Sequence, residues 1–523
     1  MNNNLINSCS QQYIKLENRL VLLAWLNSLL GYQSNKQLLE DTKDVPEGFG
    51  SDGRSFLYHH LIARGNKLKL NPEDLARYDQ NIRAHLAAIN NRRPEPVTLR
   101  YFQYLAALYT EIFLDRYFSH RAQLLADLNA FVAKRNARKS PSEAQDASFT
   151  EDDLKKSAYW MATGSGKTLI LHLNYYQFLH YNNNEPLDNI LLITPNEGLS
   201  EQHLAELAAS GIPAQRFDPD APSAWTEKHE TIKVIEITKL TKEKRGEGVS
   251  VPVEAFEGRN LIFVDEGHKG AGGEAWRKYR DALGKDGFTF EYSATFGQAL
   301  SAARDDALTA EYGKCIIFDY SYRYFYGDGY GKDFRILNLS DEAHQKQTDL
   351  LLLGNLLSFY EQLRLYETQG AELQPYNLEK PLWVFVGSTV NAVYSEHKTK
   401  RSDVLTVVRF MHKVLRDRSW AEAGIRSLLK GETSLVSPDG MDVFAGRFAF
   451  LRELSESPDA LYADFLSRLF HARSAGGLRL CTIRSSQGEL GLKAAGADHY
   501  FGVIYIGDTA AFKKLVEADK SEV

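Results

Sequence analysis

The stretch that decides the fold reads Ala162-Thr163-Gly164-Ser165-Gly166-Lys167-Thr168, between the apolar run 158–161 and the helix-patterned segment 169–179. Its small residues let backbone N–H groups curl around phosphate oxygens, and Lys167 adds a positive charge. The Thr168 hydroxyl is suited to hold Mg²⁺ at the start of the helix. The stretch predicts a loop for the phosphates of a nucleoside triphosphate, although Met161 occupies a position where the full pattern has Gly.

The composition indicates a globular protein of several domains. At 523 residues the chain is too long for one hydrophobic core, and its size predicts about three domains. It is 43% apolar and 25% charged, and it contains no apolar run long enough to cross a bilayer. Residues 1–10 lack the charged-then-apolar order of a signal peptide, so we expect a cytoplasmic location and no membrane partner.

Cysteine spacing and net charge limit the kinds of site and partner that the chain can be expected to have. The three cysteines, Cys9, Cys315 and Cys481, lie far apart and form no zinc-ligand spacing or disulfide framework. The net charge of −6 argues against a protein that is basic all over. A local basic groove for nucleic acid remains compatible with that charge.

The front of the chain predicts helices. Residues 1–134 repeat apolar side chains at three- and four-residue spacing and predict an N-terminal helical domain, interrupted by turn formers at 45–53. Residues 135–156 are polar and mixed in charge, which predicts a linker or mobile insertion.

After the phosphate loop the pattern predicts an α/β fold. Between 157 and 335, short apolar runs alternate with helical stretches, as in a parallel sheet covered on both faces. The expected strands are 189–194, 232–237, 260–264, 288–293 and 315–318. Residues 336–523 predict a second, incomplete α/β lobe, with a first strand at 382–386, a helical insertion at about 391–473 and later strands at 478–483 and 500–506.

An apolar strand runs directly into two carboxylates, Asp265 and Glu266. At the end of a buried strand Asp265 is placed to hold Mg²⁺, and Glu266 to orient the attacking water. His268 follows, and we interpret it as a hydrogen-bonding link between the ATP and nucleic-acid sites rather than as a metal ligand. The hydroxyls of Ser293 and Thr295, after the next strand, are placed to relay the state of the phosphate site.

Together these motifs resemble those of superfamily 2 helicases and translocases. Residues 161–168 look like motif I, 194–196 like motif Ia, 265–268 like the DExH form of motif II, and 293–295 like motif III. The forms of motifs I and II look most like the motors of type I and type III restriction enzymes and related bacterial helicases. The resemblance implies a RecA-like first lobe, ATP and Mg²⁺ as cofactors, and a DEAH-box type of hydrolysis.

The resemblance also implies binding residues. ATP would be bound by Gly164, Ser165, Gly166, Lys167 and Thr168, and Gln103 of the Leu99-Arg100-x-x-Gln103 signature would read the adenine edge. The alternative for Gln103 is a side chain on a helix surface. Thr194, Pro195 and Asn196, with Thr238 as a further contact, would lie near the nucleic-acid backbone; the alternative for Thr194-Pro195 is a strand terminator.

The sequence departs from the family in its second half. Residues 383–389 look like motif IV, yet no Gln-x-x-Gly-Arg-x-x-Arg segment follows, and Ser486-Gln487-Gly488-Glu489 lacks the arginines. We expect a truncated chain or a separately supplied part; ATP binding without efficient turnover is the other interpretation. The aromatic segment 319–332 fits either stacking of unpaired bases or an aromatic hinge between lobes, and we favour the hinge.

These observations predict an ATP-dependent translocase or helicase acting on nucleic acid, double-stranded DNA rather than RNA, in a restriction-like antiphage role. A partner polypeptide would supply nuclease or modification activity. The alternative function is a nucleotide-gated DNA-binding or scaffold subunit that needs a partner or further residues for hydrolysis or cleavage. The direction of translocation along the nucleic acid, the sequence preference and the oligomeric state do not follow from these residues.

Overall fold

A computed structural model divides the chain into two compact units, Met1–Asp333 (unit 1) and Phe334–Val523 (unit 2). The structure describes residues 15–140, 143–183, 185–218, 230–241, 251–252, 256–266, 274–331, 337, 348–373, 378–386, 394–396, 399–401, 403–454, 457–483, 488–507 and 509–518. Among these residues, none of the helices combines the length and apolarity that crossing a membrane requires.

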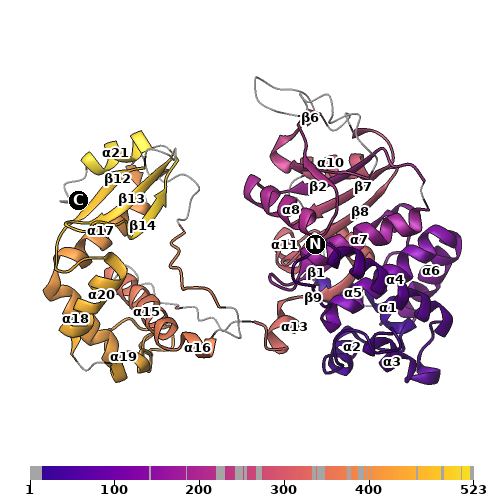
Figure 1. Cartoon of the computed structure of the whole chain (residues 1–523), viewed down its shortest axis with the longest axis horizontal. Helices are drawn as coiled ribbons and strands as arrows, with labels where there is room; N and C mark the ends of the chain where they lie inside the picture. Colours follow the sequence, from indigo (N-terminus) through magenta and orange to yellow (C-terminus); the bar gives the residue numbers. More distant parts are fainter. Residues whose placement is uncertain are drawn as a thin grey trace, which may run out of the picture. The chain divides into compact units, whose positions relative to one another are not determined.

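A seven-stranded sheet forms the centre of unit 1, in the order β3-β4-β2-β7-β8-β1-β9 (Figure 1). All neighbouring strands are parallel. The strands are β1 (Lys156–Met161), β2 (Asn189–Thr194), β3 (Ala214–Arg216), β4 (Ile232–Glu236), β7 (Asn260–Asp265), β8 (Phe288–Ser293) and β9 (Ile316–Tyr320), with a separate short pair β5 (Leu240–Thr241) and β6 (Val251–Pro252). The predicted α/β class and the strands expected in this lobe are confirmed.

Helices cover both faces of this sheet. α7 (Lys167–Asn182) and α8 (Glu197–Ala209) connect strands in the direction from β1 toward β4, whereas α10 (Glu274–Gly284), α11 (Phe296–Ala303) and α12 (Asp306–Cys315) connect strands in the opposite direction. Because crossovers between parallel strands are right-handed, the two sets lie on opposite faces. This two-faced cover explains why the strands read as continuous apolar runs.

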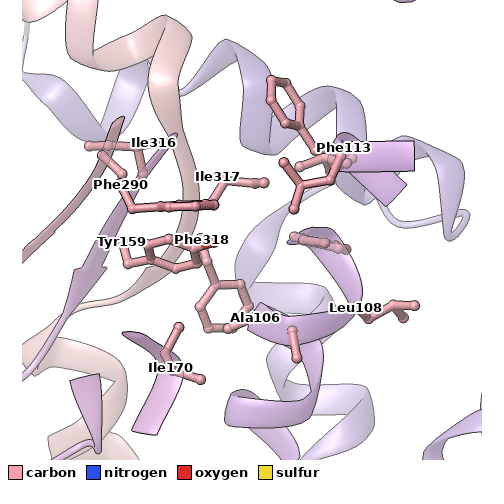
Figure 2. Close-up of a cluster of buried hydrophobic side chains, with 14 of the residues drawn as sticks. Ala106, Leu108, Phe113, Tyr159, Ile170, Phe290, Ile316, Ile317 and Phe318 are labelled. Carbon is pink, nitrogen blue, oxygen red and sulfur yellow. The ribbon is translucent and has the colours of Figure 1, made fainter. Parts of the chain in front are cut away.

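The N-terminal helices share one hydrophobic core with the sheet. They are α1 (Val21–Leu29), α2 (Asn35–Thr42), α3 (Phe56–Ile62), α4 (Pro72–Asn90), α5 (Tyr101–Ser119) and α6 (Arg121–Asn136). α5 contacts α7 and β9, and all its residues from Tyr101 to Leu114 are buried. Figure 2 shows Phe113 and Ala106 of this helix in one cluster of buried side chains with Tyr159 of β1, Phe290 of β8 and Phe318 of β9. The N-terminal helices therefore pack directly on the sheet and complete its hydrophobic core.

The segment predicted as a linker, 135–156, is held by hydrogen bonds where the structure describes it. The Asn136 side chain donates to the Asp146 carbonyl (2.9 Å) and accepts from its N–H (2.8 Å). The Asn129 side chain makes the same pair of bonds with Phe149. These amides satisfy backbone groups that a polar segment without secondary structure would otherwise leave to water.

Unit 2 has its own core of helices and a small sheet. Its helices are α15 (Thr348–Thr368), α16 (Gly370–Leu373), α17 (Asp403–Arg416), α18 (Arg418–Lys430), α19 (Ala449–Leu454), α20 (Pro458–Phe470) and α21 (Thr509–Ala518). Its strands are β10 (Tyr394–Glu396), β11 (Thr399–Arg401), β12 (Leu478–Thr482), β13 (Glu489–Ala494) and β14 (Gly502–Tyr505).

The strand pairing in unit 2 differs from the expected RecA-like lobe. β12, β13 and β14 pair antiparallel, because the connections between them are too short for a parallel crossover. The predicted strand 382–386 is neither strand nor helix, and Leu382 and Val386 are 82% and 81% exposed. It was predicted from apolarity alone, but a strand also needs backbone hydrogen bonds to a neighbouring strand, and none joins these residues to another strand in the described part of the chain. The rest of the motif IV segment, 387–389, lies outside the described residues.

Candidate nucleotide-binding site

The sheet topology brings the predicted motifs to one edge. β1, β7 and β8 are parallel, so the segments that follow them begin at the same end of the sheet. The phosphate loop follows β1, the acidic pair ends β7, and Ser293 ends β8. β8 is the single strand between β1 and β7.

The phosphate loop is closed by its own hydrogen bonds and two left-handed glycines. The Ser165 hydroxyl and N–H both donate to the Ala162 carbonyl, at 2.6 and 3.2 Å. Gly164 and Gly166 have φ of +83° and +86°, a conformation that residues with a Cβ adopt at a cost. α7 begins at Lys167, so its first N–H groups, which lack partners within the helix, point to the end of this loop.

Gln103, in the first turn of α5, contacts the phosphate loop with its side-chain amide. Its Nε2 donates to the Ser165 carbonyl (2.9 Å), and its Oε1 accepts from the Arg100 N–H (2.9 Å). A Cβ on Gly166 would lie 2.3 Å from that Nε2, so another residue there would displace the Gln103 amide in addition to adopting an unfavourable φ of +86°. The alternative of a helix-surface Gln is wrong, because the residue is 7% exposed. The predicted contact between Gln103 and adenine stays a prediction.

Asp265 is held by two hydrogen bonds at the tip of β7. Its Oδ2 lies 2.9 Å from His203 Nε2, and its Oδ1 accepts from the Glu266 N–H at 3.0 Å. Burial opposes ionisation of this carboxyl, but the hydrogen bond and charge of His203 and the positive charge of Lys167 together lower its pKa. The positive charge of Lys167 is thus one of the groups that stabilise the ionised carboxyl of Asp265.

Glu266 adopts an unusual backbone conformation. Its φ is +54°, in the left-handed region that non-glycine residues rarely occupy. Such strain persists where the surrounding structure fixes it, and it is concentrated at functional sites. His268, predicted as a link to the nucleic-acid site, lies outside the described residues.

The residue types at this edge fit Mg²⁺. Asp265 is ionised and Thr168, half-buried in the first turn of α7, offers a hydroxyl oxygen; Mg²⁺ prefers such hard oxygen ligands and keeps several waters. Each Asp265 oxygen accepts one hydrogen bond, which leaves lone pairs for a metal or for metal-bound water. Thr168 and Asp265 are therefore the pair that could hold the ion.

The motif III residues join β8 to the strand of the phosphate loop. Ser293 is buried and its hydroxyl accepts from the Thr295 N–H (3.0 Å). Trp160 of β1 donates from Nε1 to the Ala294 carbonyl between them (3.1 Å). The Thr295 hydroxyl is buried and makes no hydrogen bond in the described structure. The Trp160 bond links β1, which leads into the phosphate loop, to the segment that follows β8. The predicted relay of the state of the phosphate site through the Ser293 and Thr295 hydroxyls stays a prediction.

The predicted nucleic-acid residues differ in their exposure. Thr194 is 1% exposed and its hydroxyl bonds to Ser200 (2.7 Å), so that side chain faces the protein. Asn196 is exposed and caps α8 by accepting from the Leu199 N–H (3.0 Å). Pro195 is half-buried, and Thr238 is exposed in a short 3-10 helix, Ile237–Lys239. Asn196 and Thr238 are the two that offer exposed side chains.

His203 is the site residue that the sequence did not reveal. It lies on α8, is 4% exposed, and contacts Asp265 directly. A signal was present, because Ser200, His203 and Leu207 recur at helical spacing on the buried face of α8. A buried polar side chain in such a stripe requires a partner, but the sequence does not say which one.

Comparisons with known proteins agree with the motifs. Residues 121–298 match the family described as type III restriction enzyme, res subunit. The predicted resemblance to superfamily 2 helicases of the restriction type is confirmed for this segment. None of the curated proteins matches the chain. Among solved structures, that of T4 UvsW is similar, with 13% identity and a TM-score of 0.24, over 47% of this chain and 52% of UvsW. The chain thus spans about half the length of that structure.

Proposed function

We propose that the chain is an ATP- and Mg²⁺-dependent motor that acts on nucleic acid, in particular double-stranded DNA. The observation that supports this most is that the positive charge of Lys167, the first residue of α7, acts on the carboxyl of Asp265 at the end of β7. The family match over residues 121–298 supports the same class of activity.

Each residue at this edge has a role in the proposed hydrolysis. The loop amides and Lys167 bind the β- and γ-phosphates of ATP, with Ser165 and the two glycines shaping the loop. When bound by Thr168 and Asp265, Mg²⁺ neutralises charge on the β- and γ-phosphate oxygens. Glu266 orients and polarises the water that attacks the γ-phosphate. Ser293 and Thr295 transmit the change to the rest of the lobe.

Nucleic acid would bind along the same edge of the sheet. The exposed side chains of Asn196 and Thr238 follow β2 and β4, and contacts of this kind go to sugar and phosphate. Binding would then depend on salt and little on sequence. His268 would link this surface to the acidic pair.

ATP hydrolysis in the presence and absence of double-stranded DNA tests the proposal. We expect DNA to stimulate phosphate release by the wild type, and Lys167→Ala and Glu266→Gln each to lower the stimulated rate at least about 100-fold. The exposed pair Lys36 and Glu40 provides matched controls, Lys36→Ala and Glu40→Gln, which should keep the wild-type rate. Turnover by Lys167→Ala equal to the wild type would exclude this site.

The same assay separates the alternative function. A nucleotide-gated DNA-binding or scaffold subunit would bind ATP tightly, change its DNA affinity with nucleotide, and release no phosphate. The family match also supports a role beside a nuclease or modification polypeptide in antiphage defence. Co-purification of such a polypeptide and ATP-dependent DNA cleavage by the pair would support that role; cleavage that is independent of ATP would argue against it.

A further inference from the structure

The three-stranded sheet of unit 2, in the order β12-β13-β14, has two different faces (Figure 1). Side chains alternate between the faces of a strand, and the antiparallel pairing aligns those that share a face. Leu478, Leu492 and Ala494 lie on the inner face and belong to the core of unit 2. The opposite face, which we call the outer face, includes Arg479, Glu489, Gly491, Lys493, Val503 and Tyr505.

Apolar and aromatic side chains of the outer face are open to solvent. Tyr505 is 71% exposed and Val503 is 56% exposed, and Tyr500, which precedes β14, is 48% exposed. A Cβ on Gly491 would lie 2.8 Å from Cδ1 and Cε1 of Tyr500, so that ring lies over the glycine on the outer face. The sheet thus supports the Tyr500 ring on one side and leaves it accessible on the other.

The two tyrosine rings have no partner within the chain. Among the described residues, the side chains of Tyr500 and Tyr505 make no hydrogen bond and contact no other ring or cation. Neighbouring exposed apolar and aromatic side chains of this kind mark a surface that interacts with another molecule.

Two cations lie on the same face. Arg479 of β12 pairs directly with Lys493 of β13, and like charges in such a cross-strand pair repel each other. Within the described structure neither forms an ion pair with a carboxylate. Glu489, which is also on the outer face, lies opposite Tyr505, toward the other end of β13 from Lys493. An anionic ligand at the Arg479 and Lys493 end would therefore relieve the repulsion.

This combination of rings and cations fits an unpaired nucleic-acid strand. Bases stack on aromatic rings with little regard to sequence while cations contact the phosphates, and antiparallel sheets with aromatic side chains on an open face bind unpaired bases in this way. A duplex keeps its bases stacked on one another, so they do not reach the rings. An apolar protein surface would have to bury Arg479 and Lys493 without carboxylate partners, which is costly.

We propose that the outer face of β12, β13 and β14 binds single-stranded nucleic acid. The two tyrosine rings stack with bases, and Arg479 and Lys493 contact phosphates. This inference rests on the proposed function in taking nucleic acid as the substrate, and it adds a surface of unit 2 that holds an unpaired strand. It requires neither ATP nor the phosphate loop, so it is tested without nucleotide.

Binding of a fluorescein-labelled oligothymidylate to the full chain, measured by fluorescence anisotropy, tests the role of the rings. Tyr505→Ala should weaken binding about fivefold or more, because one stacked base is lost, and Tyr505→Phe should keep the wild-type affinity. Tyr322, a 40% exposed tyrosine of α13 (Tyr322–Gly327) in unit 1, gives the matched control Tyr322→Ala, which should bind normally. Circular dichroism of each variant checks that it folds.

The salt dependence of the same binding tests the cations. Arg479→Gln and Lys493→Gln should each reduce the slope of log affinity against log salt concentration by about 0.7, the value for one phosphate contact on a single strand. The exposed Lys36 gives the control Lys36→Gln, which should keep the wild-type slope. As a direct readout of position, an oligonucleotide that carries 5-iododeoxyuridine should crosslink under ultraviolet light to Tyr500 or Tyr505.

Three outcomes would overturn the assignment. Unchanged affinity in Tyr505→Ala, with crosslinks elsewhere, would show that the strand does not reach the outer face. Loss of binding in Tyr322→Ala in place of Tyr505→Ala would assign unpaired bases to the segment 319–332. A wild-type dimer that Tyr505→Ala dissociates without affecting oligonucleotide binding would assign the outer face to a second copy of the chain.

Failure of the proposed function has a different signature. A wild type that binds the oligonucleotide through the outer face but shows no DNA-stimulated ATP hydrolysis would contradict the motor and support this inference. DNA-stimulated hydrolysis together with unchanged oligonucleotide binding in Tyr505→Ala would support the motor and contradict this inference.

Discussion

The hydrogen bond between His203 and Asp265 orients the carboxylate that we propose as a ligand of Mg²⁺. Nε2 of His203 reaches Oδ2 at 2.9 Å, and both residues are largely buried. A partner of this kind fixes the direction of a ligand's lone pairs, and its loss commonly weakens metal affinity 10- to 100-fold. Because Asn196 caps the start of α8, the same helix joins the proposed nucleic-acid contact to the proposed metal site.

Replacing His203 by Ala should therefore raise the Mg²⁺ concentration needed for half-maximal hydrolysis by about tenfold or more. The same shift should appear in Mn²⁺ binding measured by electron paramagnetic resonance in the presence of ATP. His59, which binds Asp52 at the same 2.9 Å on the surface, provides the matched control His59→Ala. Equal metal dependence in the two variants would refute a positioning role for His203.

Sequence reasoning succeeded for residues whose role follows from local order. Lys167 and Thr168 follow a glycine loop, and Asp265 ends an apolar strand, so their neighbours along the chain predict their surroundings. His203 and the bond from Gln103 to Ser165 depend on how helices from distant parts of the chain pack, which no local pattern specifies. For the same reason the burial of Thr194 against Ser200 was not foreseen.

At the scale of elements, a buried histidine joins α7 to the end of α8. His172 is fully buried, and its Nδ1 lies 2.8 Å from the Ser210 hydroxyl. Burial, with smaller effects of the charges of Arg93 and His203, lowers the pKa of His172 from 6.5 to about 3. The folded protein thus keeps this imidazole neutral in a range of pH where the unfolded chain would protonate it.

This difference predicts a loss of stability in mild acid. Between pH 6.5 and about 3 the unfolded state binds one proton more than the folded state, so stability falls as pH falls, and it is fully present above pH 6.5. From pH 8 to pH 5 the wild type should lose about 2 kcal/mol more than His172→Gln, measured by urea unfolding. Parallel pH profiles for the two proteins would contradict the neutral state of His172.

The elements of unit 1 were predicted well. In unit 2 the strands at 478–483 and 500–506 and the helices within 391–473 were predicted too, whereas the run 382–386 and the strand pairing differ from the prediction. In unit 1 the strands are buried on both faces, so apolar runs and strands coincide. In unit 2 the run 382–386 is equally apolar but lies exposed, and no strand among the described residues pairs with it. The direction of β12 to β14 follows from short connections, which the apolar pattern does not report.

On the scale of the whole molecule, the N-terminal helices and the sheet act as one body in unit 1. α5 is buried among α7, β1 and β9. Its Gln103 donates a hydrogen bond to the phosphate loop, and its Phe102 stacks on Tyr320 at the end of β9. The predicted helical domain thus contributes to the nucleotide site as well as to the core. Composition and periodicity predicted its helices, but its docking on the lobe is a tertiary feature that needs the structure.

The central claim is that Lys167 and Asp265 act on one Mg²⁺-bound ATP molecule. Its most direct test is a double-mutant cycle on Mg²⁺-dependent ATP affinity, with Lys167→Ala, Asp265→Asn and the double variant compared with the wild type. If the residues share one site, the double variant loses less binding free energy than the sum of the single losses, with a difference of more than about 0.5 kcal/mol. Losses that add within that margin would show that the two residues act at separate sites.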